Sequence, residues 1–418
     1  MVPWIFFLLL VAVDADHFYK GYKLVEVSAR NRRDLAALSK LYTEHNVDFI
    51  RKARQTGQKA VLLLSPPEVD QVLHRLNATG SAFRVSEARF TAEPASSRQR
   101  RSIASAPLQN GEKKRAFALD DYHDYDEQVD FITDVATAHP DFVKLDVMGQ
   151  SWARRDIKYL TIGYPAASQK PAFFIDAGIH AREWIAPATA LWIINELTNS
   201  TKYKALLQQI DIIIVPNLNP DGYTFTRRGA RMWRKNLTPQ STGCYGVDLN
   251  RNFPYYFGYS GVENNQCSEI WPGPNAASEP ETKTLKSYLD QNKDRIKAYV
   301  TLHSYGQNWV YPWGYASHTY PADVQDLIDL GNAASAAIAK VRGTKYNVEN
   351  SADGMYPAAG ASDDYAKSIG IKYVYTVELP PGDNDSQYDF ILPTCRIIPS
   401  ASEVFQGLLV VAEKVACL

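Results

Sequence analysis

The sequence has little net charge, few cysteines and, after its first residues, no long apolar segment. Its 418 residues carry 45 lysines and arginines against 46 aspartates and glutamates, a formal net charge of -1. Such a chain lacks the basic character typical of nucleic-acid-binding proteins and the run of about 20 apolar residues that a membrane-spanning helix needs. Its composition is that of an ordinary globular protein with room for two domains. We therefore expect a monomer without nucleic-acid or membrane partners.

The first 15 residues are the apolar exception. They are apolar from Pro3 to Val13 and end in Val13-Asp14-Ala15, with small residues near the expected cleavage point. This pattern is typical of a short secretory signal peptide, although no basic residue precedes the apolar stretch. A buried N-terminal strand is the alternative. We predict a signal peptide over 1–15 and a secreted, extracellular protein.

The four cysteines all follow residue 243 and fit that compartment. Cys244 and Cys267 are flanked by glycine, asparagine and serine and would close a loop, a bridge worth about 3 kcal/mol in the chain-entropy model. Cys395 and Cys417 could form a second bridge, but the sequence does not fix the pairing.

The charge is distributed unevenly. Residues 16–115 carry 19 basic and 10 acidic residues, a net of +9, whereas residues 116–418 carry 26 and 35, a net of -9. Two parts of opposite charge are suited to docking on each other.

Residues 16–90 contain the pattern of a small α+β domain. Strands are predicted at 22–27, 47–50, 59–64 and 82–85, and helices at 33–41 and 66–76. This βαββαβ order is the split, ferredoxin-like arrangement. Because no cluster of histidine, cysteine and acidic residues occurs in it, we interpret it as a folding or covering domain.

Residues 91–115 are polar and basic, with the strings Glu93-Pro-Ala-Ser-Ser-Arg-Gln-Arg-Arg101 and Glu112-Lys-Lys-Arg115. They form either a solvated linker or an activation segment for a trypsin-like protease, since exposed segments are where proteolytic nicking concentrates. We favour the second interpretation, which makes 16–115 an activation pro-domain with its linker.

From residue 116 to 418, predicted strands and helices alternate, which indicates an α/β domain with a central, largely buried sheet. The strands are expected at 143–147, 157–162, 171–175, 210–215, 298–303 and 372–379, and the helices at 125–138, 184–197, 279–292, 324–342 and 400–415. Ligands gather at the carboxyl ends of the strands in such sheets.

One such edge carries the stretch Asp176-Ala-Gly-Ile-His180-Ala-Arg-Glu183-Trp184, between a predicted strand and a predicted helix. An imidazole and a carboxylate three residues apart can converge on zinc, whose catalytic sites use three protein ligands and an open position. His-x-x-Glu is common by chance, so a third ligand is required.

Among the eight histidines, His303 is the best candidate for that ligand, because it ends the predicted strand 298–303 at the same sheet edge. The alternative is a satisfied core histidine. Asp248 is placed to orient His180 by a hydrogen bond, which metal-bound histidines usually require.

Glu378 ends another apolar strand, as either a buried ion-pair partner or a general base, and its place at this edge favours the base. Arg231, Arg234, Asn250 and Arg251 cluster in the sequence between the metal ligands. They are either surface residues or the bidentate donors that recognition of a carboxylate requires.

Together, five strings resemble the zinc metallocarboxypeptidases of the pancreatic A/B type, over roughly Tyr122 to Ala412. They are His180-Ala-Arg-Glu183-Trp184, Arg231-Met-Trp-Arg234-Lys235, Gly246-Val-Asp-Leu-Asn250-Arg251-Asn252-Phe253, His303-Ser-Tyr305 and Tyr356-Pro-Ala-Ala-Gly-Ala-Ser-Asp363-Asp364. The N-terminal part is similar to the inhibitory pro-domain of that family. The resemblance implies the carboxypeptidase fold, a mixed, mostly parallel sheet flanked by helices.

The resemblance also implies the roles of individual residues. His180, Glu183 and His303 would bind Zn²⁺, and Glu378 would be general base and then general acid. Arg234 would stabilise the oxyanion. The C-terminal carboxylate of a peptide would be held by Asn250, Arg251 and Tyr356, and the outer subsites would be lined by Arg182, Arg231, Ser304 and Tyr305.

Specificity is expected to depend on Asp363, which matches the position of an aspartate in B-type enzymes and of an apolar residue in A-type enzymes. We predict a zymogen of an exopeptidase that releases C-terminal Lys or Arg. Gly314 is A-like, Ser351 matches neither type, and 380–385 departs from the family's loop, so an A-type enzyme that releases apolar or aromatic residues is the alternative. A non-catalytic peptide-binding relative would have lost Glu378 or a ligand, and the carboxylate clamp disfavours a zinc deacylase.

Overall fold

The computed structural model describes residues 18–44, 47–90, 117–382 and 388–418, without the side chains of 42–44. The predicted signal peptide and the predicted activation segment lie outside the described residues, and the domain boundaries stay predictions. The chain forms two compact units, residues 1–115 with 225–233 and residues 116–224 with 234–418. Each is described by itself.

The smaller unit has the predicted βαββαβ order. Its elements are β1 (Lys23–Ser28), α3 (Arg32–Glu44), β2 (Asp48–Arg51), β3 (Lys59–Leu64), α4 (Pro66–Thr79) and β4 (Ala82–Glu87). The strands form an antiparallel sheet in the order β2-β3-β1-β4, whose apolar residues pack with those of α3 and α4 in one core. Sequence chemistry sets the ends of α4: Ser65 and Glu68 form a capping box, and Gly80 ends the helix with a φ of 69°.

The larger unit is built on an eight-stranded mixed sheet in the order β11-β10-β12-β9-β7-β8-β6-β5. The four central strands β12, β9, β7 and β8 are parallel, and antiparallel pairs lie toward both edges. The strands are β5 (Val143–Gln150), β6 (Asp156–Ile162), β7 (Ala172–Ala177), β8 (Asp211–Val215), β9 (Ile296–Ser304), β10 (Asn308–Tyr311), β11 (Asn347–Asn350) and β12 (Tyr373–Leu379). The predicted mixed, mostly parallel sheet is confirmed.

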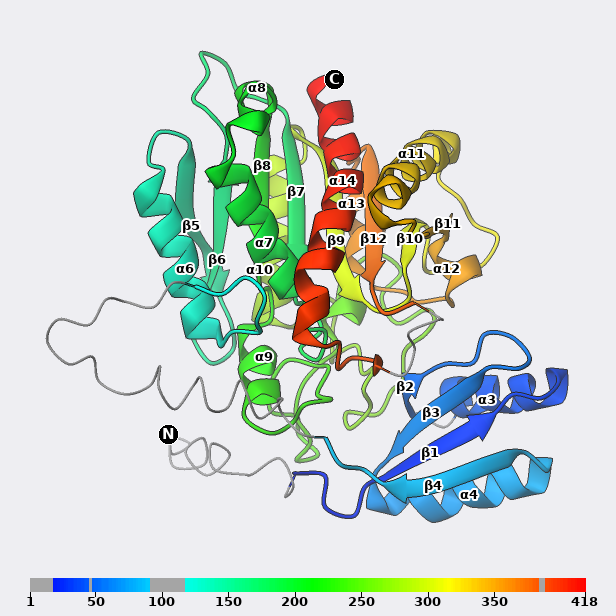
Figure 1. Ribbon diagram of the computed structural model, residues 1–418. Coiled ribbons are helices and arrows are strands. Elements are labelled where there is room, and N and C mark those ends of the chain that lie inside the picture. The colour runs from blue at the N-terminus through cyan, green and yellow to red at the C-terminus, as the bar shows by residue number, and fades with distance from the viewer. Residues whose placement is uncertain (1–17, 45–46, 91–116, 383–387) are drawn as a thin grey trace, which may run out of the picture. The chain divides into compact units, whose positions relative to one another are not determined.

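Helices cover both faces of this sheet (Figure 1). One face packs against α6 (Tyr125–Ala138), α7 (Ile185–Asn199), α8 (Lys204–Gln209), α11 (Val324–Arg342) and α14 (Ile397–Ala416). The other packs against α10 (Pro280–Asn292), α13 (Ser362–Ser368) and the short turn η3 (Leu249–Arg251). The remaining helices are α9 (Pro220–Arg227), α12 (Ser351–Gly354), η2 (Thr201–Tyr203) and η5 (Thr394–Arg396).

The register of the central strands positions the polar residues. His303 on β9 pairs with Glu378 on β12. Two residues earlier on each strand, Thr301 pairs with Thr376, and Thr301 also pairs with Asp176 on β7. Because side chains alternate between the faces of a strand, these two rows lie on one face, two residues apart at about 3.3 Å per residue. The row nearer the carboxyl edge carries His303 and Glu378.

Among the described residues, one helical segment, Thr394–Ala416, is long and apolar enough to cross a membrane. It packs against the sheet beside α7 and α11, and 56% of its most apolar window is buried. It is therefore a core helix.

One of the two cysteine pairs is a disulfide and the other is not. Cys244 and Cys267 form a disulfide, as predicted, whereas Cys395 and Cys417 are exposed free thiols. The 20-residue helix α14 separates the free thiols and holds their backbones about 30 Å apart at 1.5 Å per residue. A disulfide requires Cα atoms within about 7 Å, so these two cannot bridge each other.

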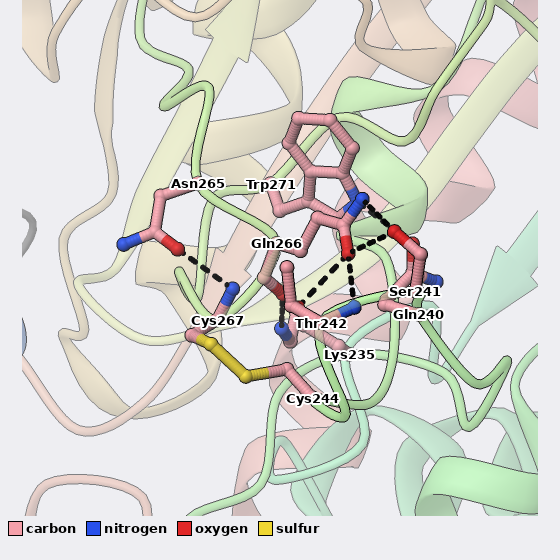
Figure 2. The surroundings of a disulfide bond; sticks show 9 residues. All are labelled: Lys235, Gln240, Ser241, Thr242, Cys244, Asn265, Gln266, Cys267 and Trp271. Carbon is pink, nitrogen blue, oxygen red and sulfur yellow. Dashed lines mark hydrogen bonds between the residues drawn. A yellow bond between two sulfur atoms is a disulfide. The ribbon is translucent and has the colours of Figure 1, made fainter.

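The Cys244–Cys267 disulfide closes a loop that is hydrogen-bonded to its surroundings (Figure 2). The side-chain carbonyl of Gln266 accepts hydrogen bonds from the backbone N–H and the hydroxyl of Thr242, at 3.0 and 2.9 Å. The Lys235 ammonium donates to the backbone carbonyl of Gln266 at 3.2 Å. The disulfide loop is thus attached to the segment that follows Arg234.

Candidate active site

Among the described residues, one group of three side chains is arranged to hold a metal ion: His180, Glu183 and His303. All three are buried, and their candidate ligand atoms lie within 4.8 Å of one another. The Nδ1 atom of His180 lies 2.8 Å from Glu183 Oε1 and 3.1 Å from Nδ1 of His303. His180 and Glu183 come from the loop between β7 and α7, and His303 comes from β9. The strand-to-helix corner and the neighbouring strand end therefore converge, as the sequence predicted.

The electrostatics of this group favour a cation. Burial opposes the charge of Glu183, but the charges and hydrogen bonds of His180 and His303 outweigh it, so the pKa of this carboxyl lies well below its usual range. Burial and the Arg234 charge lower the pKa of His180. Burial also opposes protonation of His303, but Glu183 outweighs it and raises the pKa of that imidazole. A carboxylate and two imidazoles at this spacing form a donor set typical of zinc.

Asp248 connects the metal-binding group to Arg234. Its Oδ1 lies 3.2 Å from Nε2 of His180, and its Oδ2 accepts from Nε and Nη2 of Arg234, both at 2.9 Å. Burial opposes ionisation, but the Arg234 and Arg251 guanidiniums outweigh it and hold the pKa of Asp248 well below its usual range. The carboxylate therefore fixes Nδ1 of His180 toward Glu183 and aligns Arg234, whose Nη1 lies 3.9 Å from Glu183.

The predicted carboxylate clamp is built on short, tied loops. Asn250 accepts a hydrogen bond from the Ser362 N–H at 2.8 Å, at the start of α13. Arg251 donates from Nε to the Gly261 carbonyl and from Nη1 to the Asn250 carbonyl, each at 2.8 Å. Gly360 has a φ of 73°, and a Cβ there would lie 2.3 Å from the Arg251 carbonyl oxygen, so only glycine permits this approach.

Tyr356 is half-buried in the loop between α12 and α13. Two residues later, the Ala358 N–H donates to the Gly314 carbonyl at 2.7 Å, and the next N–H donates to the Ser260 carbonyl at 2.9 Å. The loop that carries Tyr356 is therefore fixed to the segments around Arg251 and Gly314.

Comparison with known sequences identifies the family to which this chain belongs. A sequence profile described as zinc carboxypeptidase matches residues 128–407, and one described as carboxypeptidase activation peptide matches residues 25–87. The chain belongs to the zinc carboxypeptidase family. It is an enzyme of the metallopeptidase class, and its activation peptide makes it a zymogen that proteolysis activates.

Similar carboxypeptidases carry both type names. Over 296 residues the chain is 42% identical to carboxypeptidase B of Astacus astacus, covering 70% of this chain and 96% of that protein. Over 400 residues it is 32% identical to zinc carboxypeptidase A 1 of Anopheles gambiae, covering 95% and 90%. The crystal structure of thrombin activatable fibrinolysis inhibitor superposes with a TM-score of 0.78 at 30% identity, covering 94% of this chain and 98% of that one. The family is clear, and the substrate preference stays open.

The specificity candidate of this carboxypeptidase, Asp363, is buried at the start of α13. Its Oδ2 accepts from the Thr376 hydroxyl at 2.9 Å, and its Oδ1 accepts from the Asp364 N–H at 2.9 Å. Asp364 accepts from the backbone N–H groups of Gly314 and Tyr315, at 2.7 and 2.9 Å. Burial raises the pKa of Asp363, and burial together with the charge of Asp363 raises the pKa of Asp364.

Sequence reasoning gave no role to Asp176, although it heads the metal-binding stretch. This residue is fully buried on β7, where its Oδ1 accepts from the Thr301 hydroxyl at 2.8 Å. Burial, and further the charge of Asp363, raise the pKa of Asp176 to about 6. In the described structure, the hydrogen bonds to Asp176, Asp363 and Asp364 come from hydroxyl and backbone groups, so no cationic donor offsets the cost of ionising these buried carboxyls. An acidic residue inside an otherwise apolar strand was the available signal.

The predicted outer-subsite residues lie in two groups. The backbone N–H of Ser304 donates to Glu183 Oε2 at 3.0 Å, which ties this residue to the metal-binding group. The Tyr305 hydroxyl donates to Asp389 at 2.8 Å, and the Arg182 guanidinium lies 4.4 Å from the centroid of the Phe390 ring. Residues 388–390 were not predicted.

Arg231 is buried and belongs to the segment 225–233, which clusters with the smaller unit. In the loop 380–385, which differs from the loop expected in the family, residues 383–385 lie outside the described residues.

Proposed function

We propose that the chain is the precursor of a secreted zinc exopeptidase that removes C-terminal Lys or Arg from peptides. The observation that carries the specificity is Asp363, a buried carboxylate beside Thr376, two residues below the row of His303 and Glu378. The apolar leader, the activation peptide and the Cys244–Cys267 disulfide support secretion and activation by a trypsin-like protease.

His180, Glu183 and His303 would hold Zn²⁺, because two imidazole nitrogens and a carboxylate oxygen converge and Asp248 orients His180 from behind. When bound, zinc would polarise the scissile carbonyl and lower the pKa of a water molecule toward ~7.

The protein's own groups would do the remaining work. Glu378, paired in register with His303, would accept a proton from the attacking water and pass it to the leaving amine. Arg234, aligned by Asp248, would stabilise the negative charge that develops on the carbonyl oxygen.

A carboxylate clamp would confine the enzyme to free C-termini. Asn250, Arg251 and Tyr356 would bind the terminal carboxylate of the peptide, with Arg251 offering the bidentate geometry that carboxylates favour. The hydrogen bonds of Asn250 and Arg251 to the surrounding loops support this role, because they restrict the positions that the donors can adopt. Arg182, Ser304 and Tyr305 would contact the peptide further from its C-terminus.

Specificity for basic residues follows from charge. In the part of the chain that the structure describes, the hydrogen bonds to the Asp363 and Asp176 carboxylates come from hydroxyl and backbone groups rather than from a lysine or arginine, so a cationic side chain of the substrate would compensate their charge. An apolar side chain would leave the charge buried and unpaired, a penalty of about 2–5 kcal/mol. The alternative, release of apolar residues, is favoured by the A-like residue Gly314, where a Cβ would lie 3.2 Å from the Ser351 hydroxyl.

The test compares the release of C-terminal Arg, Lys, Phe and Leu from matched peptides by the trypsin-treated protein, with and without a chelator. We expect chelator-sensitive release that favours Arg and Lys at least thirtyfold, the lower end of the 2–5 kcal/mol range. The variant Asp363→Asn keeps the shape and the Thr376 contact and should lose most of this preference. Chelator-sensitive release that favours Phe or Leu would instead establish the A-type alternative.

A further inference from the structure

Four Asn-x-Ser/Thr sequences have no part in the proposed chemistry, and the structure describes three of them. These three are Asn77-Ala-Thr79, Asn199-Ser-Thr201 and Asn236-Leu-Thr238, while the fourth, Asn384-Asp-Ser386, lies outside the described residues. Such a sequence is an acceptor for N-linked glycosylation in secreted proteins. Because a glycan is bulky and hydrophilic, the burial and the hydrogen bonds of each asparagine decide whether the folded chain can carry one.

Asn236 has no room for a glycan. Its side chain is fully buried, and its Nδ2 donates to Glu279 Oε2 at 2.8 Å and to Glu281 Oε2 at 3.0 Å. Its Oδ1 accepts from the Val247 N–H at 2.8 Å. An amide nitrogen has only two hydrogens, and a sugar would replace one of them. A glycan here would therefore take a donor from a buried carboxylate and place a sugar in the protein interior, which this fold does not permit.

Asn199 is the opposite case. It is the exposed last residue of α7, and the chain leaves the helix at once, because Ser200 is extended with a φ of -117° and a ψ of 126°. Its Nδ2 donates to the carbonyl and to the Oδ1 of Asn195, at 3.2 and 2.9 Å. Both bonds lie at the surface, where water can replace the one that a sugar would displace. Thr201, the last residue of this acceptor sequence, is exposed as well.

Asn77 is the exposed acceptor of the smaller unit. It lies in the last turn of α4 and follows Leu76, which is buried. Successive side chains are about 100° apart around a helix, so Leu76 packs inward while Asn77 faces water. Asn77 also lies within residues 25–87, the part that matches the activation peptide. The two exposed acceptors therefore belong to different parts of the precursor.

We infer that the secreted chain carries N-linked glycans at Asn77 and Asn199 and none at Asn236. The inference rests on the proposed function, because it requires secretion. The co-reactant is an oligosaccharide linked to a lipid diphosphate. The asparagine Nδ2 forms a bond to the anomeric carbon of the sugar, the bond from that carbon to the diphosphate oxygen breaks, and Nδ2 releases a proton. One glycan then leaves with the activation peptide, and the other stays on the mature enzyme.

The first experiment maps the glycans on full-length protein that is expressed with its own leader in mammalian cells and collected from the medium. A peptide N-glycosidase converts each glycosylated asparagine to aspartate, which heavy-oxygen water marks for mass spectrometry; a sample without the enzyme is the control. We expect the mark at Asn77 and Asn199, with Asn236 unmarked. Secreted protein that lacks the mark at Asn77 or Asn199, or that carries it at Asn236, overturns the inference.

Three matched variants test the acceptor sequences one at a time: Thr79→Ala, Thr201→Ala and Thr238→Ala. The first two should each remove one glycan-dependent step in gel mobility, and the third should remove none. Thr79→Ser and Thr201→Ser keep the hydroxyl and should keep the step, which separates loss of an acceptor from loss of folding.

Activation adds a check on where the glycans lie. After trypsin cleavage near Arg115, the glycosidase should shift the activation peptide of the wild type but not that of Thr79→Ala. An unshifted wild-type activation peptide, or a step lost in Thr238→Ala, contradicts the inference.

The outcomes also separate the inference from the proposed function. Secreted protein that releases Lys or Arg after activation but has no glycan at Asn77 and Asn199 overturns the inference and leaves the proposed function standing. Protein that stays inside the cells without any glycan refutes the proposed secretion, and the inference fails with it.

Discussion

Asp248 provides the sharpest test of how the site is held together, through the substitution Asp248→Asn. One oxygen of this carboxylate faces Nε2 of His180 and the other accepts from Arg234. An asparagine has the same shape but only one acceptor, and its amide N–H₂ can accept from neither the imidazole N–H nor the guanidinium. One of the two donors must therefore lose its partner.

The magnitude depends on which donor loses its partner. Loss of the group that orients a metal-bound histidine lowers metal affinity by about 10- to 100-fold. An arginine displaced from a developing oxyanion costs about 10²–10³ in kcat. We expect Asp248→Asn to weaken zinc binding by at least tenfold, measured by competition with a chelator of known affinity, and to lower kcat at saturating zinc.

Asp221→Asn is the matched control. Asp221 is also fully buried and accepts from an arginine, Arg155, at 2.7 Å, but it contacts neither His180 nor Arg234 in the described structure. It should reduce stability without changing zinc affinity. The reasoning is refuted if both variants lower stability equally and Asp248→Asn retains wild-type zinc affinity and kcat.

Three other predictions follow from the same contacts. Since burial raises the pKa of Asp176 to about 6, this carboxyl takes up a proton as the pH falls through that value. The ratio of Arg to Phe release in kcat/KM should therefore fall between about pH 7 and 5, and it should fall less in the variant Asp176→Asn; an unchanged wild-type ratio would contradict the proposed role of Asp176 in recognising a basic side chain. The double variant Cys244→Ser/Cys267→Ser should lose about 3 kcal/mol of stability in urea unfolding. Because the loop from 244 to 267 carries Asn250 and Arg251, the KM for peptides should rise as well. A lower urea midpoint with an unchanged KM would show that the disulfide does not help to position these two residues. Finally, the uncut precursor should hydrolyse peptides more slowly than protein cut near Arg115, and equal rates would show that the precursor is not latent.

Much of the fold was predictable because long periodic segments carry their own signal. The helices at Tyr125–Ala138 and Val324–Arg342 and the strand at Lys59–Leu64 have the predicted bounds. The strands at Asn308–Tyr311 and Asn347–Asn350 were missed, since four residues are too short to show a period. They exist because Asn308–Tyr311 pairs with β12 and Asn347–Asn350 pairs with Asn308–Tyr311 at one edge of the sheet.

The candidate site was predictable where its residues end recognisable strands. His180, His303 and Glu378 each follow or close an apolar run, and the parallel sheet brings such ends to one edge. Asp389 could not be found this way, because its position depends on a left-handed turn that ends at Leu392. No periodic pattern reports such a turn.

Asp176 shows how one sheet would serve both the proposed chemistry and the proposed specificity. Along β9, His303 and Thr301 point to the same face two residues apart, and the same spacing separates Glu378 from Thr376 on β12. The deeper residues meet Asp176 and Asp363 through hydroxyl hydrogen bonds. In the proposed function, a substrate side chain that enters below the reacting bond would therefore meet the Asp176 and Asp363 carboxyls about 6–7 Å beneath it, a distance set by two residues of strand. Shifting the register of β9 by one residue would move His303 and Thr301 to the opposite face together, so the same strand register positions a proposed metal ligand and the hydroxyl that contacts Asp176.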